Sequence, residues 1–271
     1  MSADPLQHRP EQPAPAYVPG HQLLAGRNVV VTAAAGAGIG AAVVRRALEE
    51  GARTVVFSDT HARRLAEAEA VLAEEFGADR VRQTVCDVTD QAQVEALLDL
   101  AEESGPIDVM VNNAGLGGTA SVLEMTDDEW SRVLDITLTG TFRCVRAAGQ
   151  RMREAGTRGV VVNNASVIGW RAQEGQAHYA AAKAGVMALT RCAALDLAPF
   201  GIRVNAVSPS LAMHPFLAKV TSDELLAELK QREAFGRAAE PWEVANAMVF
   251  LASDYSSYLT GEVLSVSSQH A

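Results

Sequence analysis

A tyrosine, a lysine and a serine in this chain could together move a proton on or off an alcohol oxygen. Tyr179 and Lys183 would share one face of a helix, because residues i and i+4 are neighbours there. A free phenol has a pKa of about 10, too high for acid–base work at neutral pH, and a nearby ammonium lowers that pKa. The hydroxyl of Ser166 could hydrogen-bond the same substrate oxygen. Alone, the Tyr/Lys spacing also arises by chance on exposed helices, so the rest of the chain has to support it.

A glycine cluster follows a β-branched run over 29–32 and opens a helical pattern. Glycine at such a place permits a tight turn and lets phosphates approach backbone N–H groups at a helix N-terminus. An ordinary tight turn would also contain glycine, but the strand before and the helix after favour a dinucleotide site. The residues expected at the phosphates are Gly36, Gly38, Ile39 and Gly40.

The second apolar run ends at Ser58 and Asp59. A carboxylate there can accept hydrogen bonds from both ribose hydroxyls of adenosine and would repel a 2′-phosphate, which favours NAD over NADP. Two alternatives stay open. Asp59 could simply cap the next helix, and Arg63 and Arg64 are near enough to keep NADP as a minority option.

Two further strand ends carry residues suited to a cofactor. Asp87 and Val88 close the third apolar run, where adenine would lie in such a fold. The fourth closes with Asn113, Ala114 and Gly115, whose small residues leave room for a ligand. An asparagine can also brace a strand end, so the sequence is equally compatible with a structural role and with direct contact to the cofactor.

Apolar runs alternate with helical patterns along most of the chain. Strands this apolar have both faces covered, which is typical of a parallel sheet with helices on each side. With right-handed crossovers, the pattern predicts an α/β fold: one doubly wound (Rossmann) sheet in a single domain over 23–271. The strands are expected over 29–32, 54–57, 81–86, 107–111, 160–163, 203–207 and 263–267. The helices are expected over 39–50, 63–76, 91–104, 127–153, 179–198, 222–233 and 242–252.

Composition narrows the class of protein. The 271 residues are 48% hydrophobic and 21% charged, which suits a globular domain with a sizeable core. A net charge of −10 argues against a nucleic-acid partner, which would need a basic face. The cysteines, Cys86, Cys144 and Cys192, predict buried free thiols in a reducing compartment and no metal site.

The N-terminal end has its own composition. Residues 1–22 contain five prolines and few apolar residues, so we expect a tail that is disordered or draped over a neighbour. No apolar run reaches the roughly 18 residues of a membrane span, and no signal-peptide core is visible. We therefore expect a cytoplasmic protein without a membrane partner.

Taken together, these motifs resemble the short-chain dehydrogenase/reductase family over about residues 25 to 268. The resemblance rests on the glycine-rich turn, Asp59, Asp87-Val88, Asn112-Asn113-Ala114-Gly115, Ser166, Tyr179-x-x-x-Lys183 and Pro209. It implies that Tyr179 exchanges a proton with the substrate oxygen, while Ser166 positions the carbonyl. Lys183 would lower the pKa of Tyr179 and hold the nicotinamide ribose.

The resemblance also implies an activity, a cofactor and an assembly. An enzyme of this family would interconvert a small-molecule secondary alcohol and ketone, with the hydride carried by the cofactor. Its members are usually homotetramers, or dimers, in which long helices pair between subunits. The helices expected over 127–153 and 179–198 match those.

The chain departs from the family pattern in four places. The turn reads TAAAGAGIG where the family usually has TGxxxGxG. Thr137 replaces an asparagine that often supports a proton-relay water, so a catalytic Thr137 would hold water differently. Pro209 precedes Ser210 rather than glycine, with Leu211 expected along the cofactor and His214 in place of a threonine that contacts the carboxamide. The end reads SSQHA where many relatives have Asp-Gly-Gly.

The substrate wall should come from the segments after Gly115, Ser166 and Pro209. These segments are bulky and apolar, which suits an apolar ring system. The residues expected to contact substrate are Trp170, Met213, His214 and Phe216. Arg171 could meet an anionic group such as a CoA phosphate or carboxylate, or it could be an exposed surface residue.

A closer resemblance concerns an actinobacterial subgroup labelled acetoacetyl-CoA or 3-oxoacyl reductases. The stretches NNASVIGWRAQ, HYAAAKAGVMALTRC and SDYSSYLTGEVLSVSSQH carry it. One branch of that subgroup oxidises a ring hydroxyl on the hydroindane propanoyl-CoA fragment of cholesterol, which implies a steroid-derived CoA thioester as substrate. The alternatives are an acetoacetyl-CoA or 3-oxoacyl thioester reductase and, in a different class, a dinucleotide-binding protein without turnover.

Overall fold

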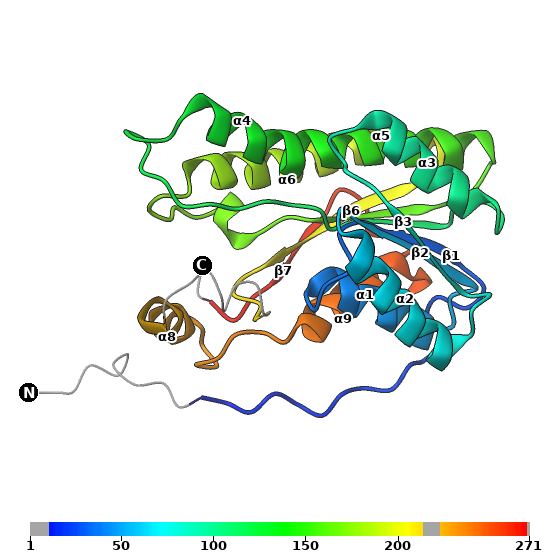
Figure 1. Cartoon of the computed structure of the whole chain (residues 1–271), viewed down its shortest axis with the longest axis horizontal. Coiled ribbons are helices and arrows are strands. Elements are labelled where there is room, and N and C mark those ends of the chain that lie inside the picture. The colour runs from blue at the N-terminus through cyan, green and yellow to red at the C-terminus, as the bar shows by residue number, and fades with distance from the viewer. Residues whose placement is uncertain (1–10, 214–222, 270–271) are drawn as a thin grey trace, which may run out of the picture.

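One parallel sheet of seven strands runs through the chain in the order β3-β2-β1-β4-β5-β6-β7 (Figure 1). The structure is a computed structural model that describes residues 11–213 and 223–269. The strand order reverses between β1 and β4, and ligands of such sheets bind at that switch point, beyond the carboxyl ends of the strands. The strands are β1 Asn28–Val31, β2 Thr54–Asp59, β3 Val81–Val85, β4 Val109–Asn112, β5 Val160–Asn164, β6 Arg203–Pro209 and β7 Val263–Val266.

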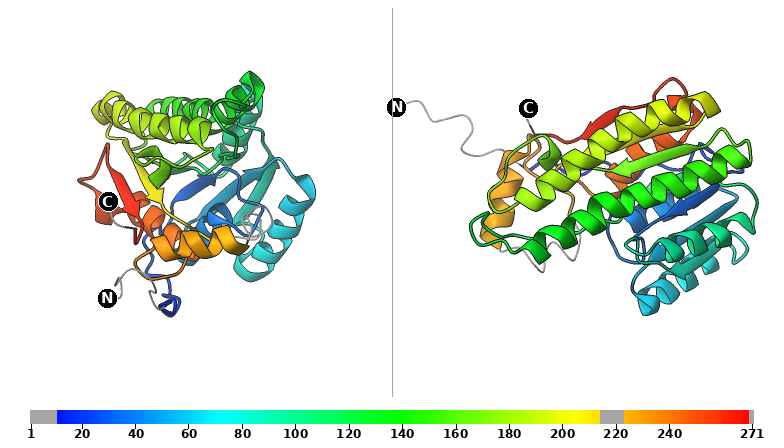
Figure 2. Two further views of the ribbon diagram at one scale, coloured as in Figure 1. Left: turned by 90° about the vertical axis from the view of Figure 1, so that its left-hand side faces the viewer. Right: turned by 90° about the horizontal axis from the view of Figure 1, so that it is seen from above.

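Helices cover both faces of the sheet, so the predicted doubly wound fold is confirmed (Figures 1 and 2). Val29 and Val31 of β1 point into one core cluster, while Val30 between them points into the other. The first cluster lies under α1 Ile39–Glu49, α2 Ala62–Phe76 and α9 Pro241–Ala252. The second lies under α3 Gln91–Glu102, α5 Gly140–Glu154 and α6 Ala177–Leu197.

The long helix expected over 127–153 contains an irregular turn. It consists of α4 Asp127–Leu134, a π-helical turn over Asp135–Thr139, and α5. Such π-turns insert an extra residue into a helix and often lie at functional sites. The sequence did not predict this turn, because the apolar periodicity runs through it unbroken. It places Thr137 at the inner side of the helix, fully buried.

The remaining elements lie around the carboxyl ends of β6 and β7. The helix α8 Asp223–Arg232 is present within the range predicted for it. His214 and Phe216, two of the expected substrate contacts, lie outside the described residues. Residues 11–22 form no helix or strand and run beside α1 and α9.

Several smaller predictions can be compared with the structure. Cys86 and Cys144 are buried free thiols, but Cys192 is exposed, because its side of α6 faces away from the sheet. Burial raises the pKa of the Cys86 thiol to about 11. Within the described ranges, no cluster of side chains could hold a metal ion. None of the helices described is both long and apolar enough to span a bilayer.

Candidate active site

Ser166, Tyr179 and Lys183 lie together at the carboxyl end of β5. Ser166 follows β5 directly and begins a short 3₁₀ turn, so its hydroxyl is held at the strand end. Tyr179 lies in the first turn of α6, where its phenol hydrogen-bonds the Ser166 side chain. The Lys183 Nζ lies 5.6 Å from the centroid of the Tyr179 ring. The three side chains that the sequence singled out therefore form one cluster.

Burial sets the protonation of this cluster. It raises the pKa of Tyr179 to about 12, while the hydrogen bond with Ser166 acts in the opposite direction. It also lowers the pKa of Lys183 to about 8. The sequence-based expectation was that Lys183 lowers the pKa of the phenol. The protein alone differs, because both groups have lost water and the buried ammonium is itself destabilised.

Asparagines connect this cluster to the glycine-rich turn. Lys183 Nζ donates to the Asn164 carbonyl oxygen at 2.5 Å. Asn164 Nδ2 donates to Asn113 Oδ1 at 2.9 Å, and Asn113 Nδ2 donates to the Ala33 carbonyl oxygen at 2.9 Å. The sequence analysis missed Asn164. Its signal was present, because Asn163-Asn164 ends β5 just as Asn112-Asn113 ends the adjacent β4.

The glycine-rich turn has the geometry of a phosphate-binding loop. Ala33 adopts a left-handed backbone with φ of 53°, a conformation that glycine usually provides. A Cβ on Gly40 would lie 2.5 Å from the Ala33 oxygen, so only glycine fits there. Gly36 has open space around its Cα, and Gly38 begins α1 without a side-chain cap. The uncapped N–H groups of Ile39 and its neighbours therefore fit a dinucleotide pyrophosphate.

Asp59 lies beside this turn, at the carboxyl end of β2. Its Oδ2 accepts a hydrogen bond from the Ala35 N–H at 3.3 Å, and its Oδ1 accepts one from the His61 N–H at 3.2 Å. His61 rather than Asp59 is the residue that precedes α2 as its N-cap. Arg64 approaches the Asp59 carboxylate to 3.8 Å, whereas Arg63 is largely exposed. The Asp59 carboxylate is therefore held against the glycine-rich turn by backbone hydrogen bonds.

The other expected cofactor residues follow the same edge of the sheet. The Asp87 carboxylate accepts hydrogen bonds from the Thr89 N–H and hydroxyl, and Val88 packs against Gly140 of α5. The Ala114 N–H donates to the Thr32 hydroxyl. A Cβ on Gly115 would lie 3.3 Å from Lys183 Nζ. Pro209 ends β6, and Leu211 follows it in the same loop.

Thr137 bridges the loop after β4 to the π-turn. Its hydroxyl accepts a hydrogen bond from the Leu116 N–H at 2.9 Å and donates to the Leu116 oxygen at 3.2 Å. The methyl group of Thr137 approaches Gly115, which also faces the Lys183 ammonium. Thr137 therefore braces the loop that carries Gly115.

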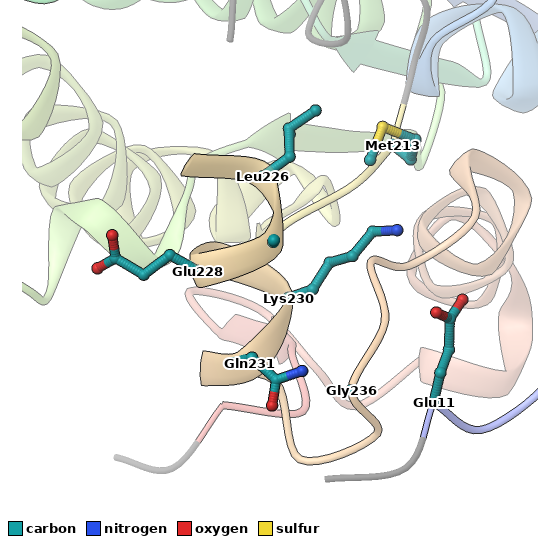
Figure 3. A pocket seen from close by; sticks show the side chains of 8 residues that line it. Glu11, Met213, Leu226, Glu228, Lys230, Gln231 and Gly236 are labelled. Carbon is teal, nitrogen blue, oxygen red and sulfur yellow. The ribbon is translucent and has the colours of Figure 1, made fainter. Parts of the chain in front are cut away.

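Two of the residues expected to contact substrate, Trp170 and Met213, lie among the described residues. Trp170 is half exposed and follows the 3₁₀ turn after Ser166. Met213 lines an open pocket together with Leu226 and Lys230 of α8, and Figure 3 shows the Lys230 side chain extending between Met213 and Glu11. The sequence analysis missed His178, which is buried next to Tyr179 and accepts its N–H at Nδ1. Its position directly before the tyrosine was the only signal.

The chain is similar to known proteins over most of its length. A family model described as "Enoyl-(Acyl carrier protein) reductase" matches residues 33–268. A protein of Mycobacterium tuberculosis named (5R,7aS)-5-hydroxy-7a-methyl-1-oxo-2,3,5,6,7,7a-hexahydro-1H-indene-carboxyl-CoA reductase is 63% identical over 258 residues, covering 95% of this chain and 98% of its own. A 3-alpha-(or 20-beta)-hydroxysteroid dehydrogenase of the same organism is 41% identical over 88% of this chain and 86% of its own.

A solved structure is similar over nearly the whole chain. The crystal structure of a short chain dehydrogenase from Mycobacterium smegmatis matches with a TM-score of 0.85 and 56% sequence identity. The match covers 96% of this chain and 99% of that chain.

Proposed function

The chain belongs to the short-chain dehydrogenase/reductase family of nicotinamide-dependent oxidoreductases, and we propose that it interconverts a ring alcohol and ketone on a steroid-derived CoA thioester. The fragment would be a hydroindane, two fused rings carrying an acyl-CoA side chain. The observation that carries the reaction type is the cluster of Ser166, Tyr179 and Lys183, tied through Asn164 and Asn113 to the glycine-rich turn.

In the proposed mechanism, Tyr179 is the acid–base group. During oxidation the carbinol hydroxyl gives its proton to the Tyr179 oxygen, while the hydrogen on the carbinol carbon leaves with two electrons. A bound nicotinamide supplies the acceptor for that hydride. The Ser166 hydroxyl donates to the substrate oxygen and shares its negative charge. Lys183 holds the nicotinamide ribose, and its charge favours the phenolate.

We propose NAD as the cofactor, because a carboxylate at the end of β2 would accept hydrogen bonds from the adenosine ribose and would repel a 2′-phosphate. Asp59→Ala is expected to lower the ratio of kcat/KM for NAD to kcat/KM for NADP by at least about tenfold. The reason is that the carboxylate no longer repels the 2′-phosphate of NADP. Asp79→Ala, which removes a carboxylate elsewhere, is a control for the change in net charge. An unchanged NAD/NADP ratio would show that Asp59 only braces the turn.

The substrate class rests on similarity to the hydroindane-carboxyl-CoA reductase and on the apolar substrate wall that includes Trp170 and Met213. The deciding experiment measures NADH and NADPH formation at mildly alkaline pH with the hydroindane propanoyl-CoA alcohol and with linear 3-hydroxyacyl-CoAs. Fast oxidation of the ring alcohol is the expected result. Activity confined to the linear thioesters would make the protein an acetoacetyl-CoA or 3-oxoacyl reductase, and no turnover with either set would leave a dinucleotide-binding protein.

Self-association is a further part of the proposal. Trp130 of α4, Phe142 of α5 and Leu195 of α6 are exposed apolar side chains. These three helices lie together in one layer on one face of the sheet (Figure 1). Pairing of these helices between copies would cover that apolar surface. Sedimentation velocity is expected to give a dimer or tetramer, and a monomer at micromolar concentration would contradict this assignment.

A further inference from the structure

Glu233, directly after α8, holds four hydrogen bonds although it is almost completely buried. Its Oε1 accepts from the Leu211 N–H at 3.2 Å and from Gln269 Nε2 at 2.8 Å. Its Oε2 contacts the Ser210 hydroxyl at 3.1 Å and the Ser268 hydroxyl at 2.8 Å. One carboxylate thus joins the loop after β6, the end of α8 and the segment after β7.

A buried carboxylate needs a reason, because burying charge is costly unless the group is fully hydrogen-bonded. No Lys or Arg within the described ranges forms an ion pair with Glu233. An apolar side chain of similar size would stabilise such a position at least as well. The four contacts therefore indicate a residue that fixes the position of its neighbours.

Gln269 extends the network toward the substrate wall. Its Nε2 donates to Glu233, so its Oε1 must point the other way, since an amide has one donor end and one acceptor end. That oxygen accepts a hydrogen bond from Arg171 Nη1 at 2.5 Å. The Glu233 carboxylate thereby fixes the orientation of the Gln269 amide, and the amide fixes the guanidinium.

Among the described residues, Arg171 lacks the carboxylate partner that several other partly buried arginines have. Arg151, Arg143 and Arg237 each pair with a carboxylate within 3 Å. Arg171 is also partly buried, but the partner found for it among the described residues is a neutral amide. Its positive charge is therefore held in place without being neutralised, and donors remain at Nε and Nη2.

We propose that Arg171 binds an anionic oxygen group of the substrate, and that Gln269 and Glu233 are positioning residues that present its guanidinium. Arg171 lies five residues after Ser166, in a segment of the substrate wall. A planar guanidinium with free donors suits a carboxylate or a phosphate, and either lies remote from the reacting alcohol. The inference rests on the proposed function, because it assumes that this wall faces the substrate.

The test compares three forms of one hydroindane alcohol: the CoA thioester, the free acid and the methyl ester. Arg171→Gln is expected to raise KM for an anionic form at least about tenfold, because one charge-assisted contact is lost. KM for the methyl ester, which carries no charge, should stay within about twofold of the wild-type value. A rise confined to the free acid and not the thioester assigns a carboxylate site. A rise confined to the thioester assigns a phosphate site.

Gln269→Leu tests the positioning role, because it removes the amide but keeps Arg171 and the Glu233 contacts with Leu211 and Ser210. It is expected to raise KM for the anionic form severalfold with little change in kcat. Glu233→Leu should raise this KM and also weaken NADH binding, since Gln269 loses its partner and Leu211 loses its acceptor. Arg153→Gln, which removes an exposed arginine on α5, is the control.

Two outcomes overturn the inference. One is an equal change of KM for the methyl ester and the anionic forms in Arg171→Gln. The other is a KM for every form that matches the Arg153→Gln control. Wild-type enzyme that oxidises none of the three forms would instead defeat the proposed function, so the two failures are distinguishable.

Discussion

At the scale of single residues, Tyr179 must lose and regain a proton although burial raises the pKa of its phenol to about 12. Among the residues that the structure describes, Ser166 is the one neighbour that lowers this pKa. A positive charge brought beside the phenol would lower it further. We therefore expect the reaction to depend on the assembled site, in which cofactor and Lys183 act on Tyr179 together.

Tyr179→Phe is the most direct test of that role. The change removes one oxygen and keeps the ring, so turnover should fall by about a thousandfold while NADH still binds. Steady-state kinetics measure the fall in turnover, and the fluorescence of bound NADH measures the retained binding. Tyr258→Phe, on the surface, is the matched control. A Tyr179→Phe protein with more than a tenth of wild-type activity would assign the proton transfer to another group.

The burial of Lys183 predicts how the stability of the protein depends on pH. Burial lowers its pKa from 10.5 to about 8, so between these values the unfolded chain binds more protons than the folded one. Stability therefore rises with pH across this window, and the cost of the buried charge is fully present below pH 8. Lys183→Met should be more stable than wild type at pH 7, by up to about 3 kcal/mol. The Asn164 oxygen that loses its donor reduces this gain.

Urea unfolding of both proteins at pH 7, 8, 9 and 10 measures this effect. The stability advantage of Lys183→Met should shrink steadily as the pH rises. Tyr179 has the opposite effect on the pH dependence of stability, because its raised pKa lowers stability as the pH rises from 10 towards 12. The measurement therefore stops at pH 10. A pH-independent difference between the two proteins would mean that Lys183 is not a destabilised buried cation.

At the scale of elements, the π-turn gives Thr137 a task that its sequence position did not reveal. Its hydroxyl satisfies both backbone groups of Leu116. Thr137→Val keeps the shape but leaves these groups without a partner, which should cost about 1–3 kcal/mol. Because the loop also carries Gly115 and Gly117 beside Lys183 and Tyr179, kcat/KM should fall as well.

Thermal unfolding and kinetics of Thr137→Val, with Thr137→Ser as the control that keeps the hydroxyl, distinguish two roles. A lower Tm together with lower kcat/KM supports bracing of the loop. A lower kcat with an unchanged Tm would contradict bracing and would support the alternative, a water held for proton relay.

The elements differ in how well the sequence predicts them, for physical reasons. Buried strands such as β1 and β5 are continuous apolar runs, so their positions and the sheet class follow from the pattern. The cluster of Ser166, Tyr179 and Lys183 follows from fixed spacing on one helix and one strand end. The π-turn and the Glu233 network do not, because they depend on contacts between segments far apart in the chain.

At the scale of the whole molecule, the segment over residues 11–22 joins parts that the sheet does not connect. The Gln12 N–H donates to the Phe235 oxygen after α8, while the Tyr17 ring packs edge-on against Trp242 of α9 at 5.3 Å. Arg46 of α1 lies 5.5 Å from the centre of the Tyr17 ring. Buried Glu50 forms a 2.8 Å ion pair with Arg46 and accepts the N–H groups of His21 and Leu23.

These contacts predict that the N-terminal segment stabilises the domain. Deleting residues 2–19 should lower the free energy of unfolding by about 2 kcal/mol, the sum of one aromatic contact and one cation–π contact. The hydrogen bonds that are also lost are offset by the conformational entropy that the chain no longer gives up. In a chain of this size that corresponds to a fall in Tm of roughly 5 °C. Calorimetry measures it at fixed protein concentration.

A single substitution tests the same prediction without removing any residue. Gly20 crosses α1 so closely that a Cβ would lie 2.3 Å from the Glu49 carbonyl oxygen, and that backbone atom cannot move aside. Gly20→Ala should therefore detach Tyr17 and lower Tm about as much as the deletion does, whereas Pro15→Ala, at an exposed position of the same segment, should not. Equal Tm values for wild type, Gly20→Ala and the deletion would show that the segment contributes nothing to stability. A loss in Gly20→Ala alone would mean that α1 is distorted, because the deletion removes the segment and leaves α1 intact.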